Sequence, residues 1–246
     1  MDSLPYPDGC RGAVSLTFDD AHPSQLSVAV PTMERYGLRG TFYVNPREDY
    51  RQQLKPFAEL VARGHELGNH TVSHPCSRNF DFVTRGLEEW SLEEIEADIL
   101  EAARRLQELA PEVQEWTFCY PCYQSDVGEG ERRQSYTPIV ARHFLAARAW
   151  GEAANHPGRV DLHYLGSYDC HRRSGAEMIG LCELAAAEGR WVILTFHGVG
   201  SGHLSVDARD FEKLCAHLGA HRDRLWTAPV VQVARAVRRW REQQRG

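Results

Sequence analysis

At 246 residues, 42% of them hydrophobic and 25% charged, the chain has enough apolar material for one large core, so we expect a single domain over 1–246. The net charge of −6 gives no basic surface for nucleic acid or for an anionic membrane. No apolar run approaches the roughly 20 residues that a helix needs to cross a bilayer. These values predict neither nucleic acid nor membrane as a partner, and they leave the oligomeric state open.

The N-terminal stretch MDSLPYPDGCRGA starts with an acidic residue and lacks the hydrophobic segment of a secretion signal. We therefore expect a cytoplasmic protein whose seven cysteines are mostly reduced and buried. Cys119 and Cys122, in CYPC, have the spacing of a redox or zinc motif. Because the chain has no second C-x-x-C and no short thioredoxin-like context, we interpret the pair as structural or as part of a pocket wall.

Short apolar runs alternate with longer amphipathic stretches along the chain. In the helix predicted at 91–109, Ser91 and Glu94 form a capping box, and apolar residues follow on one face. Alternating strands and helices indicate an α/β fold with a mostly parallel sheet, and about eight strands suit a barrel at least as well as an open sheet. Strands are predicted at 13–18, 40–44, 65–70, 116–121, 144–150, 160–166, 191–197 and 224–228, and helices at 24–36, 53–63, 91–109, 175–188, 207–218 and 229–241.

Polar or titratable residues follow several of these strands. In a parallel sheet or barrel the carboxyl ends of the strands share one rim, where functional groups collect. The polar, glycine-bearing stretches 76–90 and 122–136 are predicted to be long loops around a substrate site at this rim. The residues that the pattern brings to the rim are Asp19, Asp20, His70, His74, Tyr120, Pro121, Arg148, Trp150 and His197.

One carboxylate and two imidazoles would make a three-ligand metal set with positions left for water and substrate. Asp20, His70 and His74 are the candidates, and the two histidines can converge if the turn between them is helical. A divalent ion so held lowers the pKa of a bound water molecule. Asp19 can then accept a proton, and His197 can donate one to the leaving group. Each feature alone is also typical of ordinary strand-end residues.

With these residues in hand, the sequence resembles the polysaccharide deacetylases, carbohydrate esterase family 4 or the NodB homology domain. The first motif of the family, T-F-D-D, matches residues 17–20, and the second, H-[ST]-x-x-H, matches 70–74. The closing L-x-H motif matches Leu194-Thr195-Phe196-His197, which is one residue longer. The resemblance runs from about residue 11 to 240.

The resemblance implies a distorted (β/α) barrel of seven or eight strands and a divalent ion, usually zinc and sometimes cobalt or nickel. It implies Asp20, His70 and His74 as ligands, Asp19 as general base and His197 as general acid. The implied reaction is removal of acetyl groups from N-acetylglucosamine units or from acetylated xylan, with a carbohydrate as the partner.

The third family motif, R-x-P-[YF], falls on CYPC, so that Cys119 replaces the arginine and Cys122 the aromatic residue. The backbone N–H of Cys122 can still bind an oxyanion, and Arg148 is our candidate partner for Asp19. Trp150 is the nearest candidate for the tryptophan of the fourth motif. Its aspartate candidate is Asp169, and we expect substrate to contact Tyr120, Pro121, Cys122 and Trp150; Tyr43, Trp90 and Tyr123 are further aromatic candidates for stacking.

Two other functions stay open. The absence of a visible signal and the altered third motif also suit a cytoplasmic amidohydrolase acting on a small cyclic or linear amide. Loss of the motif arginine would suit a non-catalytic sugar- or metal-binding protein.

Overall fold

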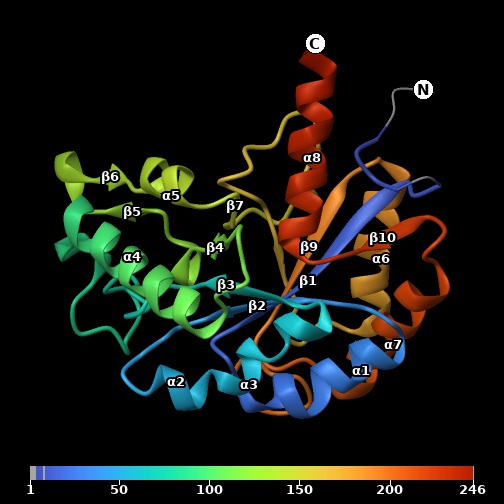
Figure 1. Ribbon diagram of the computed structural model, residues 1–246, viewed down its shortest axis with the longest axis horizontal. Helices are drawn as coiled ribbons and strands as arrows, with labels where there is room; N and C mark the ends of the chain where they lie inside the picture. Colours follow the sequence, from blue (N-terminus) through green and yellow to red (C-terminus); the bar gives the residue numbers. More distant parts are fainter. Residues whose placement is uncertain (1–3, 8, 246) are drawn as a thin grey trace.

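The structure is a computed structural model that describes residues 4–7 and 9–245 (Figure 1). Its main sheet has the strand order β7-β4-β3-β2-β1-β9-β8, and β10 pairs with β1 outside this path. Every pairing within the sheet is parallel. The strands are β1 (Gly12–Asp19), β2 (Thr41–Val44), β3 (Glu66–Asn69), β4 (Thr117–Cys119), β7 (Ala146–Arg148), β8 (Tyr168–Asp169), β9 (Trp191–Phe196) and β10 (Leu225–Thr227).

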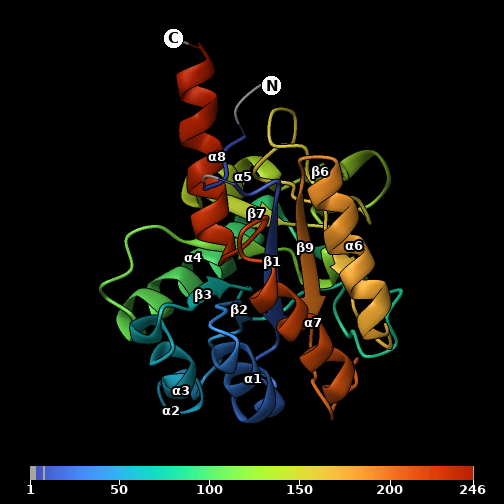
Figure 2. The same cartoon turned by 90° about the vertical axis from the view of Figure 1, so that its right-hand side faces the viewer.

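The sheet curls into a distorted (β/α) barrel, as the resemblance implied, with helices on its outer side (Figure 2). Its edge strands are β7 and β8, and the segment before β8 reaches β7 through a bridge between Arg148 and Leu165. A short antiparallel pair, β5 (Asp126–Val127) and β6 (Gln134–Ser135), lies in the loop region after β4. The helices are α1 (Val30–Arg35), α2 (Tyr50–Gln53), α3 (Lys55–Ala58), α4 (Leu92–Leu109), α5 (Thr137–His143), α6 (Gly175–Ala187), α7 (Ala208–Ala220) and α8 (Val230–Arg245).

The side chains of β1 alternate between two environments because successive residues of a strand point to opposite faces. Leu16 and Phe18 belong to the large core that packs against α1, α6 and α7. Ser15 is on the opposite face, where it accepts a hydrogen bond of 3.0 Å from Trp191 Nε1. Asp19 is in phase with Ser15, so this alternation directs its carboxylate into the barrel.

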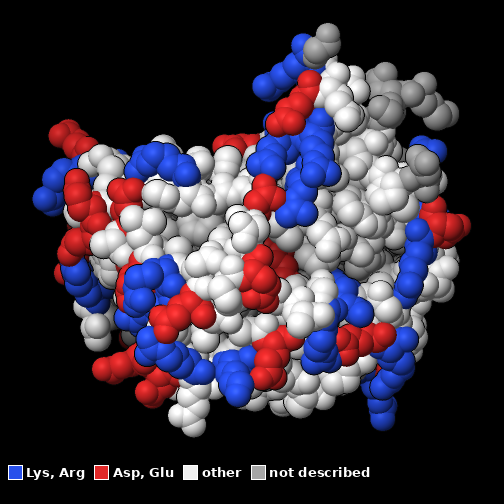
Figure 3. All heavy atoms as spheres, in the orientation of Figure 1, with Lys and Arg blue, Asp and Glu red and all other residues white. Residues whose placement is uncertain are grey.

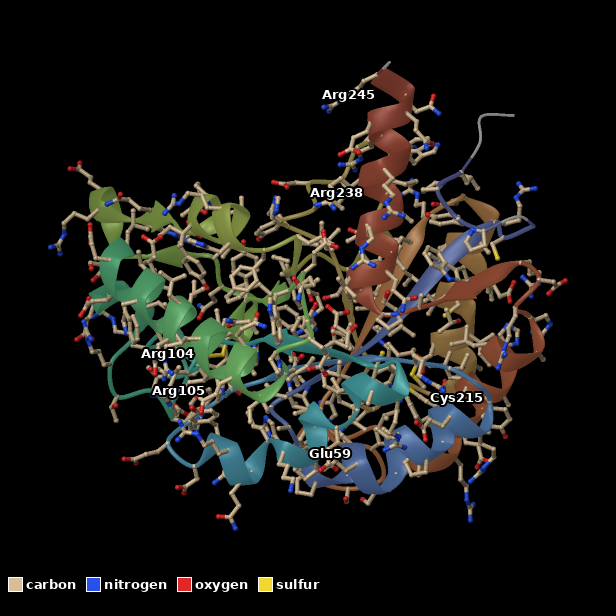
Figure 4. The ribbon with its side chains drawn as sticks, viewed as in Figure 1. Glu59, Arg104, Arg105, Cys215, Arg238 and Arg245 are labelled. Carbon is tan, nitrogen blue, oxygen red and sulfur yellow. A yellow bond between two sulfur atoms is a disulfide. The ribbon has the colours of Figure 1, made fainter. Side chains whose placement is uncertain are left out.

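Helix α8 closes the end of the barrel at which the strands begin. Its first turn donates two backbone hydrogen bonds of 2.9 Å, from Val230 to Thr41 Oγ1 and from Val231 to Glu66 Oε2. These acceptors are on the first residues of β2 and β3. The carboxyl ends of the strands are therefore left open at the other end of the barrel. The last turns of α8, with Arg238 and Arg245, project beyond the body of the molecule (Figure 4).

Two predicted elements are wrong. The strand predicted at 160–166 is a turn whose backbone bonds β7 at Leu162 and Leu165 without forming a strand of its own. The helix predicted at 53–63 is divided among α2, α3 and a 3-10 turn, because Pro56 has no N–H to continue the hydrogen-bond ladder. The predicted helix at 24–36 begins as a π-helical segment over Gln25–Ala29 and continues as α1.

Acidic and basic side chains are interspersed over the face shown in Figure 3. Across the described part of the chain, no helix combines the length and apolar character needed to span a membrane.

Candidate metal-dependent active site

The carboxyl ends of the strands surround one cavity of about 310 Å³. Asp19 is the last residue of β1, and Asp20 follows it. His70 and His197 directly follow β3 and β9. The structure thus brings together at one rim the titratable residues that the sequence pattern placed at separate strand ends. The lining residues are Asp19, Asp20, His70, His74, Phe80, Phe82, Tyr120, Cys122, Tyr123, His197, His203 and Leu204.

The three predicted metal ligands converge on one point. Nε2 of His70 lies 3.7 Å and Nε2 of His74 3.5 Å from Oδ1 of Asp20. One ligand atom from each residue lies within 4.8 Å of the others. These separations suit a carboxylate and two imidazoles around a single divalent ion.

The other ring nitrogen of each histidine has a partner that orients the imidazole. Nδ1 of His70 lies 2.9 Å from the carbonyl oxygen of Cys119, to which only an N–H can donate. Nδ1 of His74 lies 3.5 Å from Sγ of Cys76. Burial lowers the pKa of both histidines to about 4, so both rings are neutral near pH 7. Each Nε2 is thereby left with a lone pair toward Asp20, as metal ligation requires, and the residues present fit a zinc-like ion.

The loop between the two histidines is not helical, so the two rings converge without the helical turn that we expected to be necessary. Thr71 and His74 have positive φ angles of 63° and 53°. Asp98, on α4, holds the loop by accepting hydrogen bonds from the backbone of Val72 and Ser73, both 3.1 Å, and from Ser73 Oγ at 2.6 Å. Sequence analysis missed Asp98, because nothing in a helical surface pattern marks an acidic residue that faces a distant loop.

Asp19 is paired with Arg148, as we predicted. Nη2 of Arg148 donates to Oδ2 of Asp19, and its Nη1 donates to Thr195 Oγ1. Burial alone would raise the pKa of Asp19, but Arg148, helped by His70 and His197, holds that pKa below its ordinary value. Oδ1 of Asp19 is buried and has no hydrogen-bond partner among the described residues. Asp19, which lines the cavity, is therefore an ionised carboxylate with one oxygen that no described residue bonds.

His197 lies beside both carboxylates. Its Nε2 lies 3.9 Å from Oδ2 of Asp19 and 3.8 Å from Oδ2 of Asp20. Gln25 fixes the ends of β1 and β9 together, because its amide donates to the backbone oxygens of Asp19, at 2.6 Å, and His197, at 3.0 Å. Gln25 is a positioning residue that sequence analysis missed, since it lies in a helical segment with no motif around it.

A family model for polysaccharide deacetylases matches residues 7–134, which include Asp19, Asp20 and both histidines of the ligand set. The chain belongs to the polysaccharide deacetylase family.

The relatives agree with this membership. A chitin deacetylase from Arthroderma benhamiae is 30% identical over 106 residues, which are 41% of this chain and 28% of that protein, so the match spans about a quarter of the relative. Two solved structures with low identity show the same fold. A Mycobacterium smegmatis protein assigned as a polysaccharide deacetylase has a TM-score of 0.66 at 18% identity, covering 97% of this chain and 95% of its own. The peptidoglycan deacetylase PdaC from Bacillus subtilis has a TM-score of 0.55 at 16% identity, covering 97% and 96%.

The exchange of arginine for cysteine in the third motif has a simple geometric basis in this member of the family. Cys119 on β4 and Arg148 on β7 are paired residues of adjacent parallel strands. Paired residues of neighbouring strands point to the same face, so a guanidinium at either position reaches the same space. Nη2 of Arg148 indeed contacts Sγ of Cys119, which lies 3.9 Å from Asp19 Oδ2. The guanidinium beside Asp19 therefore comes from β7 and not from the neighbouring strand β4, where the family motif would place it.

The candidate residues for the fourth family motif, Trp150 and Asp169, do not contact the catalytic histidine candidate His197 through a hydrogen bond. Nδ1 of His197 is buried without a hydrogen-bond partner among the described residues, so neither candidate, Trp150 nor Asp169, bonds it. Asp169 Oδ1 instead accepts from the backbone of His171 at 3.2 Å. Trp150 is 51% exposed, and its ring packs edge-on against Tyr123, with centroids 5.2 Å apart.

The predicted state of the cysteines is wrong for one pair. Cys76 and Cys122 form a disulfide, while the other five cysteines are free. Sequence spacing pointed to Cys119 as the neighbour of Cys122, but Cys119 faces Asp19 on a strand, and Cys122 lies in the following turn. Disulfides are typical of oxidising compartments, and the cytoplasmic location stays a prediction.

The predicted substrate contacts differ in position. Tyr120 and Cys122 line the cavity, whereas Pro121 and Trp150 are not among its lining residues. The hydroxyl of Tyr120 is turned away, donating to the carbonyl of His163 at 2.9 Å. Sequence analysis missed Phe80, Phe82 and His203, which sit in loops without regular spacing. Of the aromatic candidates, Tyr123 reaches the cavity, while Tyr43 is fully buried below it and Trp90 packs into the core around α4 and α5.

Proposed function

We propose that this protein is a metal-dependent hydrolase that removes acetyl groups from an acetylated carbohydrate, either an oligosaccharide containing N-acetylglucosamine or acetylated xylan. The observation that carries the proposal is the pair of adjacent carboxylates with different partners. Asp20 faces two neutral imidazoles, and Asp19 faces a buried guanidinium. One carboxylate is thus suited to hold a cation and the other to accept a proton.

A divalent ion held by Asp20, His70 and His74 supplies Lewis acidity to the acetyl carbonyl and to a water molecule. Asp19 takes the proton of the attacking water on its free Oδ1, because Arg148 occupies Oδ2. His197, whose Nε2 lies within 4 Å of an oxygen of each carboxylate, protonates the departing amine or sugar oxygen. The backbone N–H of Cys122 stabilises the oxyanion.

The walls of the cavity support a sugar substrate. Phe80 and Phe82 lie on its rim with exposed fractions of 40% and 70%, and Tyr123 forms another wall. Solvent-exposed aromatic rings offer apolar faces for a pyranose ring. Two further cavities, of about 500 and 490 Å³, share lining residues with the central one, the first at Asp20 and Phe82 and the second at Tyr123. Three neighbouring cavities with shared walls suit a chain of several sugar units.

A small amide is the second candidate substrate, and the limited volume of the central cavity, about 310 Å³, favours it. A structurally similar allantoinase has a TM-score of 0.65 at 12% identity, covering 96% of this chain and 93% of its own, which shows that the fold is shared and no more. A non-catalytic binding protein is disfavoured because Asp19, Arg148 and His197 keep a complete proton-transfer geometry beside the ligand set.

The test is release of acetate from acetylated chito-oligosaccharides, xylo-oligosaccharides and non-sugar amides. We expect activity on a sugar substrate, its loss with a strong chelator, and its return with zinc or cobalt. Asp19→Asn should abolish turnover while metal binding persists. Turnover of non-sugar amides alone would support the amidohydrolase, and metal binding without acetate release from any substrate would support the binding protein.

A further inference from the structure

The disulfide between Cys76 and Cys122 lies directly beside the ligand set. It joins two loops that are 46 residues apart in sequence, one following His74 and the other following β4. Cys76 is fully buried, and Cys122 lies half-buried on the cavity wall. A reductant that enters the cavity can therefore reach the sulfur of Cys122.

Cys76, Cys122 and His74 themselves form a potential metal site. One ligand atom of each lies within 4.8 Å of the others. Two thiolates and one imidazole make a softer set than a carboxylate and two imidazoles, and zinc and cobalt bind such sets tightly. While the disulfide is intact its sulfurs are not thiolates, so this second set can act only after reduction.

His74 belongs to both sets and faces each with a different ring nitrogen. Its Nε2 lies 3.5 Å from Asp20 Oδ1, and its Nδ1 lies 3.5 Å from Cys76 Sγ. A neutral imidazole has one nitrogen with a lone pair and one that carries a proton. When Nδ1 ligates an ion, the proton is on Nε2, and Nε2 can no longer serve the set with Asp20 and His70. The two sites exclude each other.

We propose that reduction of Cys76–Cys122 creates a second, thiolate-rich metal site with His74, which withdraws the ion from the catalytic set. A dithiol reductant supplies two electrons and two protons, its own sulfurs become a disulfide, and the protein gains two thiols. These thiols lose their protons when the ion binds. The oxidised enzyme is then the active form and the reduced enzyme a metal-loaded, inactive form.

The geometry of the loops allows this change. The Cα atoms of Cys76 and Cys122 are 5.8 Å apart. In a tetrahedral zinc site with Zn–S bonds of about 2.3 Å, two sulfurs are about 3.8 Å apart. The sulfurs must separate by about 2 Å from bonding distance, which side-chain rotation in two loops can provide. Water or substrate would complete the fourth position.

The test uses the full chain loaded with one equivalent of cobalt, before and after reduction with a phosphine, which avoids adding a thiol that itself binds metal. We expect thiolate-to-cobalt charge-transfer absorption only in the reduced protein, with the bound ion staying at one per chain. His70→Ala should lose cobalt binding when oxidised and keep it when reduced. This readout does not depend on activity. Only the expected effect of reduction on turnover rests on the proposed function, so the inference and the proposed function can fail separately.

Four further variants locate the sulfur ligands. Cys76→Ser and Cys122→Ser should each show weaker charge-transfer absorption than the reduced wild type, with no response to the reductant, whereas Cys10→Ser, at a partly exposed free thiol, should behave like the wild type. Acetate release by the wild type should fall about tenfold or more on reduction and recover on reoxidation. The inference is overturned by absorption that is lost in Cys119→Ser yet kept in Cys76→Ser, by two ions per chain after reduction, or by an unchanged cobalt spectrum.

Discussion

Replacing Arg148 by glutamine tests how the charge of the proposed base is maintained. Arg148 is fully buried and Asp19 is 4% exposed, so Arg148→Gln leaves a carboxylate in the barrel without its cation. Breaking a buried ion pair by removing one partner costs about 3–5 kcal/mol. That is a large part of the roughly 5–15 kcal/mol that stabilises a typical domain. We expect a folded protein with a clearly lowered midpoint of unfolding.

The same change moves the pH dependence of the reaction. Burial acts to raise the pKa of Asp19, and Arg148 is the strongest of the groups that lower it. A neighbouring arginine favours the charged form of an aspartate and so lowers its pKa. Turnover needs ionised Asp19 and is lost as the pH falls through its pKa. The acid limb of the profile in Arg148→Gln should therefore lie at a higher pH than that of the wild type.

The assay combines denaturant unfolding with pH–rate profiles of acetate release at saturating zinc. Asp19→Asn combined with Arg148→Gln should recover much of the lost stability, because no buried charge is left unpaired, but should recover no turnover. Arg224→Gln is the matched control: Arg224 pairs with Glu183 near the surface, so its loss should cost less than about 1 kcal/mol and leave the profile unmoved. A lowered rate with an unshifted acid limb would refute the role given to Arg148.

Three further predictions concern other parts of the molecule. Cys119→Arg should destabilise the protein by several kcal/mol, because it puts a second buried cation beside Arg148, whereas adding Arg148→Cys should restore stability and turnover; equal damage in both would show that the two positions are not equivalent. Burial lowers the pKa of His65 from 6.5 to about 4. Between these two pH values the unfolded chain binds more protons than the folded protein, so the free energy of unfolding falls as the pH drops from about 6.5 to 4. The loss is up to about 1.4 kcal/mol per pH unit for each such histidine. In His65→Asn, the free energy of unfolding should fall less steeply with decreasing pH. Part of the dependence should persist because His70 and His74 remain, and an unchanged slope would contradict this. Phe82→Ala should raise KM for oligosaccharides about two- to tenfold with little change in kcat. Leu184→Ala, at an exposed residue on α6, serves as the control, and a fall in kcat alone would argue against stacking.

The sequence by itself determined the residues that meet at the rim. Asp19, Asp20, His70 and His197 each stand at or just after the end of a strand, and parallel strands carry their ends to one edge of a sheet whatever their order. Local patterns were also sufficient for α4, whose capping box of Ser91 and Glu94 is present as predicted. These features depend on residues close in sequence or on a general property of parallel sheets.

Only the tertiary structure decided which groups stand beside the rim residues. Arg148 reaches Asp19 because β7 pairs with β4 in the register that puts it opposite Cys119. Cys76 meets Cys122, and Asp98 meets the histidine loop, because separate loops and a helix converge over the barrel. Such contacts are set by strand register and by the paths of loops, which depend on how the whole chain packs. The altered third motif indicates a partner such as Arg148 for Asp19, but spacing along the sequence carries no record of the contacts of Cys76 and Asp98.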